Sequence, residues 1–240
     1  MRGSKVFWSD VTIERAAADK WGIMLDGKPI ILPAGSSLIV PSAALADKIA
    51  DEWRSCRKNT IFNPEHMPIT QLAAKQLERV APRRNEVVAQ LIGIFSADAL
   101  FYRHGDGALG RAQTQIFAMP REKFEEVFKC ALPWIDEIAP IDIAKDIIGT
   151  VEAKLSSYDD VALTGLSVLS SMTASLILTH AILYGAVTVD MGIACAFIEE
   201  NAQMARWGRD GDREAGQASC RREIEHVLQY AALSATGQAV

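Results

Sequence analysis

Two adjacent carboxylates, Glu199 and Glu200, interrupt the otherwise amphipathic stretch "FIEENAQMARWG" at residues 197–208. On a helix that turns by about 100° per residue, Glu200 lies at the centre of an apolar stripe formed by Ile193, Phe197, Met204 and Trp207. Burial of an unpaired charge is strongly unfavourable, so a core position would require a partner such as an arginine or helix amide groups. Alternatively, the stripe reaches a surface that another protein covers.

A second candidate is Asp98 in "SADALFYR", residues 96–103, where Asp98 and Tyr102 are one helical turn apart and Arg103 follows. Taken alone, these residues favour a structural carboxylate that caps a helix or pairs with Arg103. The alternative is catalytic. In that hypothesis the chain is a small-molecule hydrolase or transferase that uses Asp98, Glu200 and a histidine of the helical part.

Two stretches match known catalytic or nucleotide-binding motifs only in part. Residues 22–29, "GIMLDGKP", match a phosphate-binding loop until Pro29, which replaces the Ser or Thr that binds magnesium, and Asp26-Gly27 favours a hairpin turn instead. Residues 165–169, "GLSVL", lack the second glycine of a nucleophile elbow and lie in a helical pattern. The histidines are dispersed, and the cysteines have no zinc-ligand spacing. The sequence therefore predicts no enzyme, no cofactor and no metal site.

Composition places the chain among ordinary globular proteins. It has 240 residues, of which 49% are hydrophobic and 23% charged, with a formal net charge of −5. An acidic balance argues against nucleic acid as a partner, because phosphate recognition needs clustered basic residues. Scattered single cysteines indicate free thiols in a reducing compartment. The first ten residues, "MRGSKVFWSD", resemble neither a secretory signal nor a transit peptide, so we expect a cytoplasmic location, or the mitochondrial matrix for a trimmed chain.

One segment imitates a membrane span. Residues 161–189 contain no Asp, Glu, Lys or Arg, and this run exceeds the roughly 20 residues that a bilayer requires. The segment nevertheless contains many Ser and Thr residues and His180, and a break near Ser170-Ser171 would divide it. It therefore predicts two core helices and no stable membrane insertion.

The remaining patterns predict the elements that position these side chains. Strand-like stretches at 5–14, 21–32 and 36–41 come first, and then a helix capped by Ser42 and another capped by Thr70. Helical periodicity dominates afterwards, over residues 83–95, 120–131, 158–170, 171–185, 189–207 and 212–233. The predicted fold class is α+β, with a small β-rich N-terminal domain at 1–82 followed by a larger all-α helical domain at 83–240.

Several stretches, taken in order, carry a resemblance to one family. They are "WGIMLDGKPIILPAGSSLIVP", "ALADKIADEW", "NPEHMPITQLA", "SADALFYR", "TASLILTHAILYG" and "EENAQMARWGRDGDREA". Together they resemble the assembly chaperones of the ATP synthase catalytic sector that bind the alpha subunit, the ATP-twelve family. There are departures. Ala118-Met119 precedes Pro120 where the family has Trp-Asp, Glu199 replaces the first acid of an Asp-Glu pair, and Asp212 replaces a final Glu.

The resemblance implies a chaperone without enzymatic activity or cofactor. Such a chaperone binds the free alpha subunit through its nucleotide-binding domain and prevents its aggregation until the proper partner displaces it. The resemblance also implies the partner-binding residues, which are Glu200, Glu199, Gln203, Trp207, Asp210, Asp98 and Arg103. A further alternative is an oligomeric scaffold whose apolar helices pair with one another, and the sequence leaves self-association undecided.

Overall fold

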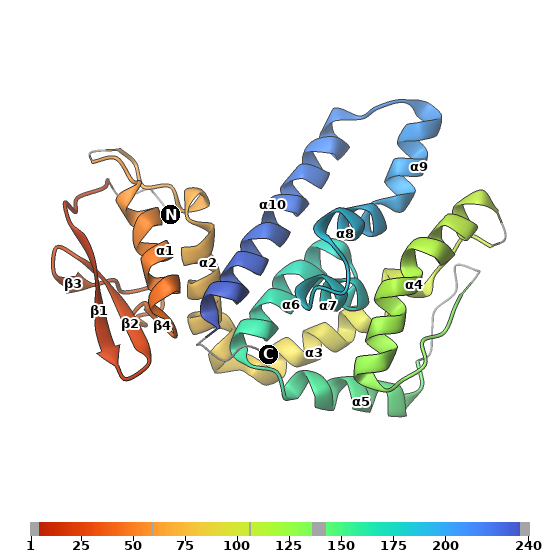
Figure 1. Ribbon diagram of the computed structural model, residues 1–240, viewed down its shortest axis with the longest axis horizontal. Helices are drawn as coiled ribbons and strands as arrows, with labels where there is room; N and C mark the ends of the chain where they lie inside the picture. Colours follow the sequence, from red (N-terminus) through yellow and green to blue (C-terminus); the bar gives the residue numbers. More distant parts are fainter. Residues whose placement is uncertain (1–4, 59, 106, 136–142, 236–240) are drawn as a thin grey trace. The chain divides into compact units, whose positions relative to one another are not determined.

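The computed structural model describes the whole chain except residues 1–4, 59, 106, 136–142 and 236–240 (Figure 1). The chain divides into two compact units. The first contains Met1–Arg83 together with His226–Val240, and the second contains Arg84–Glu225. The C-terminal stretch thus groups with the N-terminal unit, whereas the sequence assigned it to the helical domain.

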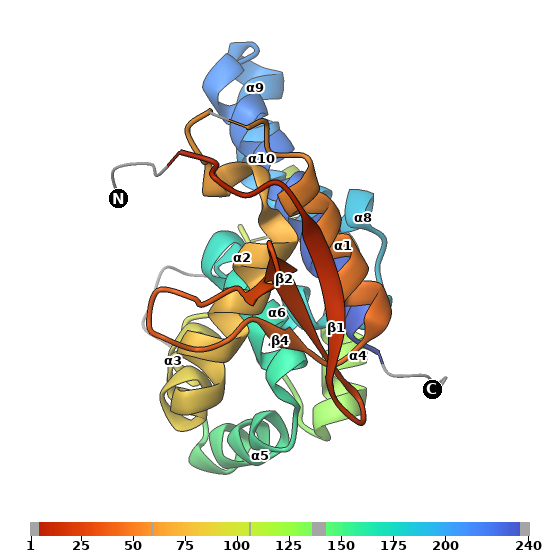
Figure 2. The same ribbon diagram turned by 90° about the vertical axis from the view of Figure 1, so that its left-hand side faces the viewer.

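A small antiparallel sheet forms part of the first unit (Figure 2). Strand β1, Val11–Ala17, pairs with β2, Lys20–Leu25. The other edge of β2 pairs with two short strands, which are β3, Lys28–Pro29, and β4, Ile39–Val40. A strand-rich beginning was predicted, and with the helices described below it confirms the α+β class.

The loop between β2 and β3 adopts a tight turn. Asp26 has φ of 48° and Gly27 has φ of 75°, and these positive values are those a two-residue hairpin requires. The predicted hairpin is therefore confirmed at the stretch that imitates a phosphate loop. The prediction of a strand from residue 5 is wrong, because Lys5 makes only an isolated bridge with Ile61 and the first strand begins at Val11.

Helix α1, Ala43–Arg54, packs against β1 and β2. Ser42 caps this helix as predicted, since its side chain accepts a hydrogen bond of 3.0 Å from the Leu45 amide. At the other end of α1, Trp53 packs on Trp8, with 5.0 Å between ring centroids. These contacts close the core of the first unit over the sheet.

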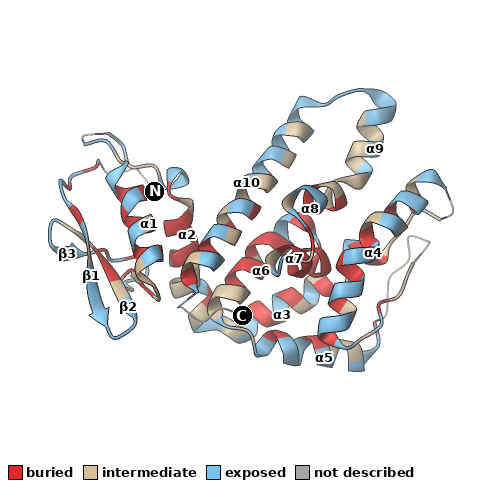
Figure 3. Ribbon diagram, in the orientation of Figure 1, coloured by how far each residue is buried: buried red, intermediate tan, exposed pale blue. Residues whose placement is uncertain are grey.

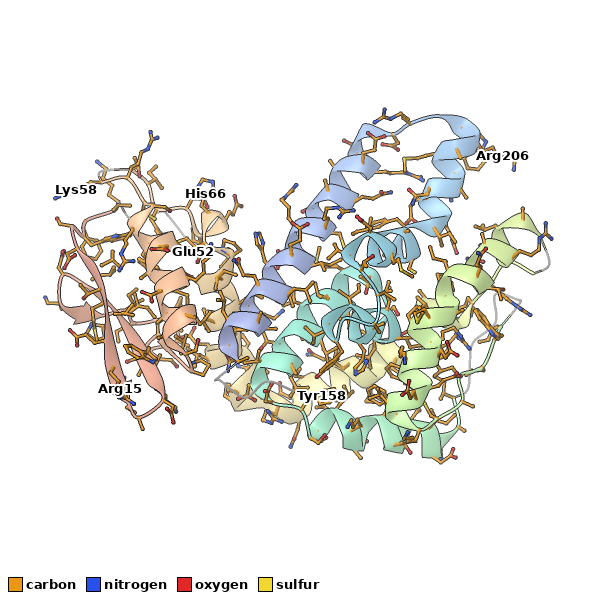
Figure 4. The ribbon with its side chains drawn as sticks, viewed as in Figure 1. Arg15, Glu52, Lys58, His66, Tyr158 and Arg206 are labelled. Carbon is orange, nitrogen blue, oxygen red and sulfur yellow. The ribbon has the colours of Figure 1, made fainter. Side chains whose placement is uncertain are left out.

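Helix α2, Pro68–Lys75, begins two residues before the predicted cap at Thr70. Glu52 of α1 supplies the cap instead (Figure 4). Its buried carboxylate accepts from the amides of Ile69 (2.9 Å) and Thr70 (2.8 Å) and from the Thr70 hydroxyl (2.7 Å). A carboxylate at a helix N-terminus pairs with amides that have no partner inside the helix, so Thr70 was not needed as the cap.

Three short helical turns accompany α2 in sequence. They are η1, Pro64–His66, the π-helical η2, Gln76–Val80, and η3, Ala81–Arg83. The last turns of the C-terminal helix join this part of the unit. The Tyr230 hydroxyl donates to the side-chain oxygen of Gln76, and the Ser42 hydroxyl donates to the Leu233 carbonyl.

The second unit is built from helices (Figure 1). They are α3, Arg84–Phe95, η4, Ala99–Phe101, α4, Ala108–Phe128, α5, Lys145–Ser156, α6, Asp160–Thr173, α7, Leu176–Leu183, α8, Val189–Ala196, α9, Ile198–Trp207, and the first part of α10, Gly211–Ser234. Buried residues concentrate on α6 and α7 (Figure 3). The 161–189 segment is therefore two core helices, and no helix within the described ranges has the length and apolarity to cross a bilayer.

Helix α4 differs most from its prediction, which began at Pro120. The helix starts twelve positions earlier, at Ala108, and Pro120 lies inside it. Proline has no N–H, so the Ile116 carbonyl one turn earlier loses its helical donor. The Cys195 thiol of α8 donates to that carbonyl at 3.3 Å. Burial raises the pKa of Cys195 to about 12, which keeps the thiol protonated and able to donate.

Two further breaks were not predicted correctly. The turn between α6 and α7 is at Ala174, which has φ of 51°, and not at Ser170-Ser171. The predicted helix 189–207 is two helices, because the chain bends at Phe197 with φ of −118° and ψ of 24°. Helix α5 was missed altogether, whereas α10 agrees with its predicted range to within one residue at each end.

Candidate partner-binding surface

The bend at Phe197 changes the geometry of the apolar stripe. Ile193 belongs to α8 and is buried at 7% exposure, whereas none of the residues of α9 is buried. Trp207, at the end of α9, is 72% exposed. The stripe therefore begins in the core at Ile193 and ends on the surface at Trp207. Of the two predicted alternatives, the core describes its first end and the surface describes its last.

Glu199 connects α9 to α4. Its carboxylate accepts a hydrogen bond of 3.1 Å from the Gln113 amide group and lies 3.3 Å from His104 Nε2. Gln113 is itself buried, and its oxygen accepts from the His104 backbone amide at 2.7 Å. Glu199 is half-exposed, so the pairing is a modest electrostatic contact that orients α9.

Gly110 makes this connection possible. A Cβ atom at this position would lie 2.0 Å from the Gly105 carbonyl oxygen and 2.6 Å from that of His104. Both atoms belong to backbone, so neither can move aside cheaply. The loop around His104 can therefore lie against α4 only because residue 110 has no side chain.

Gln203 connects α9 to α10 through Arg213, and Asp210 lies directly before α10. The Arg213 guanidinium donates to the Gln203 side-chain oxygen at 2.6 Å and lies 3.3 Å from the Asp210 carboxylate. Asp210 also accepts from the amides of Asp212 (3.0 Å) and Arg213 (3.3 Å), which caps the start of α10. Of the two predicted residues, Gln203 thus joins the helices, and Asp210 fixes the start of α10 and its Arg213.

Glu200 differs from these neighbours. It is half-buried and lines a hollow of about 450 Å³ between α9 and α10. The other residues of this hollow are Phe197, Glu199, Gln203, Arg213 and Gly216. Within the described part of the chain, the Glu200 carboxylate has no hydrogen-bond or ion-pair partner. It is therefore the one predicted acid of this helix that is not committed to an internal contact.

Trp207 completes the exposed end of α9. Its indole ring lies 5.5 Å from the guanidinium of Arg206, a residue near the end of the helix (Figure 4). Gly208 follows with φ of 103°, a value that side chains rarely allow, so the chain turns sharply towards α10. The ring is therefore accessible to another molecule, and tryptophan is enriched among the residues that contribute most to protein interfaces.

Asp98 lies in the core and not on this surface. It is fully buried, and its two oxygens accept from the amides of Leu100 and Ile177, each at 3.0 Å. It caps η4, as the structural interpretation predicted. Burial raises the pKa of Asp98 to about 6, because the apolar surroundings disfavour the charged form more than these hydrogen bonds stabilise it. Any effect of Asp98 on a partner is therefore indirect.

Arg103 packs with a second arginine around Trp134. The Arg103 guanidinium lies 5.3 Å from the ring centroid and that of the buried Arg121 lies at 3.8 Å. Arg121 also donates to the carbonyls of Leu100, Leu132 and Pro133. Arg103 is half-buried and its backbone amide donates to the Ile135 carbonyl at 2.9 Å, so it supports the segment before residue 136.

Comparison with known proteins assigns a family. The sequence model of the family described as ATP12 chaperone protein matches residues 5–127, which is more than half of the chain. The chain belongs to the ATP12 chaperone family. ATP12 proteins are ATP synthase assembly chaperones, so the family and the general role implied by the sequence are confirmed.

Solved structures extend the ATP12 likeness beyond the matched residues. The crystal structure of Atp12 from Paracoccus denitrificans has 29% sequence identity and a TM-score of 0.88, covering 97% of this chain and 99% of that one. An aspartate-to-lysine mutant of Atp12p from the same organism has 29% identity and a TM-score of 0.87, covering 98% of both chains. The Atu1473 protein of Agrobacterium tumefaciens has 29% identity and a TM-score of 0.83, covering 94% and 85%. Since the family match ends at residue 127, the likeness of α9 and α10 rests on these structures.

Several residues of the surface of this ATP12 protein escaped sequence reasoning. His104, Gln113 and Arg213 position the predicted acids, and Gly216 lines the hollow. Gln113 is 86 residues from Glu199, so no local pattern connects them. The "YRHGDGALG" stretch is rich in glycine, and its spacing was a possible signal of close backbone approach.

Proposed function

We propose that this ATP12 family member binds the free alpha subunit of ATP synthase during assembly of the catalytic sector. The observation that carries the proposal is Glu200, which is half-buried in the hollow and has no partner among the described residues. Its helix, α9, has no buried residue and ends in the exposed Trp207. A subunit that awaits an obligate interface exposes apolar surface, which associates non-specifically unless it is covered. An aromatic anchor on the same helix as an available charge suits such a surface.

The predicted site residues take different parts in this proposal. Glu200 and Trp207 contact the partner directly, since Glu200 has no partner among the described residues and Trp207 is exposed. The residues Glu199, Gln203 and Asp210 position them through α4 and α10. Asp98 and Arg103 do not contact the partner and contribute through the packing of the second unit.

The proposed function requires no chemistry, and the hydrolase or transferase alternative has less support. That alternative needs Asp98 to meet a substrate, but its carboxylate is fully buried and both oxygens accept backbone hydrogen bonds. The described residues also contain no group of His, Cys, Asp and Glu side chains suited to a metal ion. The proposed place of action is the bacterial cytoplasm, or the mitochondrial matrix for a trimmed chain.

Light scattering by purified alpha subunit tests the proposal. We expect an equimolar amount of this chain to suppress the scattering that alpha develops on dilution from denaturant, and to elute with alpha in size-exclusion chromatography. Bovine serum albumin at the same concentration is the control for non-specific protection. Unchanged aggregation and separate elution would contradict alpha binding. Steady turnover of ATP by the purified chain would favour an enzyme instead.

A further inference from the structure

The charged groups that line the α9–α10 hollow differ in whether they already have a partner within the protein. Glu199 already pairs with Gln113 and His104, and Arg213 already pairs with Gln203 and Asp210. Glu200 has no such contact among the residues that the structure describes. The hollow therefore presents one available negative charge, beside the aromatic ring of Phe197.

We infer that this hollow receives the end of an arginine side chain from the partner. The inference rests on the proposed function in so far as it requires a protein partner. A guanidinium suits both Glu200 and Phe197, because it forms paired hydrogen bonds with a carboxylate and stacks on an aromatic face. An anion would meet two carboxylates, and the only guanidinium in the hollow is already engaged.

The size of the hollow supports a single side chain as the occupant. Its volume of about 450 Å³ is near the lower end of the range for small-molecule pockets. That space is large enough for one long side chain. Lysine would supply the charge but not the planar group that stacks on Phe197 and pairs with Glu200 through two donors.

Gly216 on α10 offers a way to fill the hollow without disturbing the fold. A Cβ atom at this position would meet no other atom within 4 Å. Gly149 on α5 is also an exposed helical glycine with nothing within 4 Å, and it lies outside the hollow. Gly216→Leu therefore blocks the hollow, and Gly149→Leu is the matched control for the same change elsewhere.

An NMR titration with N-acetyl-arginine amide tests the occupant directly. We expect the probe, at millimolar concentration, to shift the backbone amide signals of Phe197, Glu200 and Gly216. N-acetyl-citrulline amide has nearly the same shape without the charge, and we expect it to cause no shift. The arginine response disappears in Glu200→Gln and persists in Glu225→Gln, an exposed acid elsewhere on α10. Equal shifts from both probes, or an unchanged response of Glu200→Gln, would overturn the inference.

Binding to the alpha subunit then separates this inference from the proposed function. We expect Glu200→Gln and Gly216→Leu each to weaken binding at least tenfold, whereas Glu225→Gln and Gly149→Leu bind normally. Thermal melting of each variant shows whether it is folded. If wild-type and both hollow variants bind alpha equally, the arginine inference fails and the proposed function stands. If alpha does not bind but the arginine probe does, the proposed function fails, and the inference that the hollow binds an arginine side chain stands.

Discussion

At the scale of single residues, two buried ionisable groups in the second unit respond to pH in opposite directions. His180 is buried, its Nε2 lies 2.8 Å from the Tyr158 hydroxyl, and burial lowers the pKa of the imidazole to about 4. Burial instead raises the pKa of Asp98 to about 6. Between these values the unfolded chain binds a proton at His180 that the folded protein does not, whereas at Asp98 the folded protein binds the extra proton.

Replacement of His180 with Phe isolates the histidine contribution. The stability that neutral His180 provides is complete above its unfolded pKa of 6.5 and is lost as pH falls towards 4. We expect the free energy of unfolding of the wild type to fall over this interval by up to about 3 kcal/mol more than that of His180→Phe. Urea denaturation at pH 7, 5.5 and 4.5 measures the difference. Parallel pH profiles of the two proteins would contradict the prediction.

At the scale of elements, α9 is held by side-chain hydrogen bonds and not by core packing. Glu199 joins it to α4, and Gln203 and Asn201 join it to α10. Helices without buried residues open at low cost. Helix α9, which carries the proposed surface, is therefore weakly anchored to the rest of the second unit.

Glu199→Ala tests how α9 is attached. Loss of the contacts with Gln113 and His104 should lower the local opening free energy by about 1 kcal/mol, since the pair is half-exposed. Amide hydrogen exchange in α9 should then be about fivefold faster, with α7 unchanged. Glu225→Ala on α10 is the control for removal of an exposed acid. Equal exchange in α9 of both variants would show that Glu199 does not anchor the helix.

At the scale of the whole molecule, the two ends of the chain build one unit. The first unit combines Met1–Arg83 with His226–Val240, so a single helix, α10, begins in the second unit and ends in the first. Val227 and Tyr230 have no exposed surface, and Tyr230 bonds to Gln76. The C-terminal turns are thus part of the core of the N-terminal unit.

A chain that ends at Glu225 tests this arrangement. Each large apolar side chain removed from the core costs about 1.5–3 kcal/mol, so the first unit should lose several times that for the missing turns. Hydrogen exchange should accelerate strongly in α1 and α2, and much less in α6 and α7. Full-length protein is the reference. An equal loss of protection in all four helices, or no loss in any, would contradict the division of the chain.

Sequence alone determined the features that depend on near neighbours. The hairpin at Asp26-Gly27 follows from backbone conformations that few other dipeptides accept, and the start of α1 follows from the cap at Ser42. The period of apolar residues identified most helices of the second unit and the division of residues 161–189 into two. The order of short motifs pointed to the ATP12 family, because each is recognisable without knowledge of its contacts.

Tertiary structure decided what depends on residues far apart in the chain. Pro120 lies inside α4, and the carbonyl that proline leaves free, that of Ile116, accepts from Cys195, 79 residues away. Glu52 caps α2 in place of Thr70, and α9 is attached through Gln113, 86 residues from Glu199. Local patterns report the preferences of a few consecutive residues, whereas these contacts form only when separate helices pack. The same packing engages Glu199 and leaves Glu200 available among the residues that the structure describes.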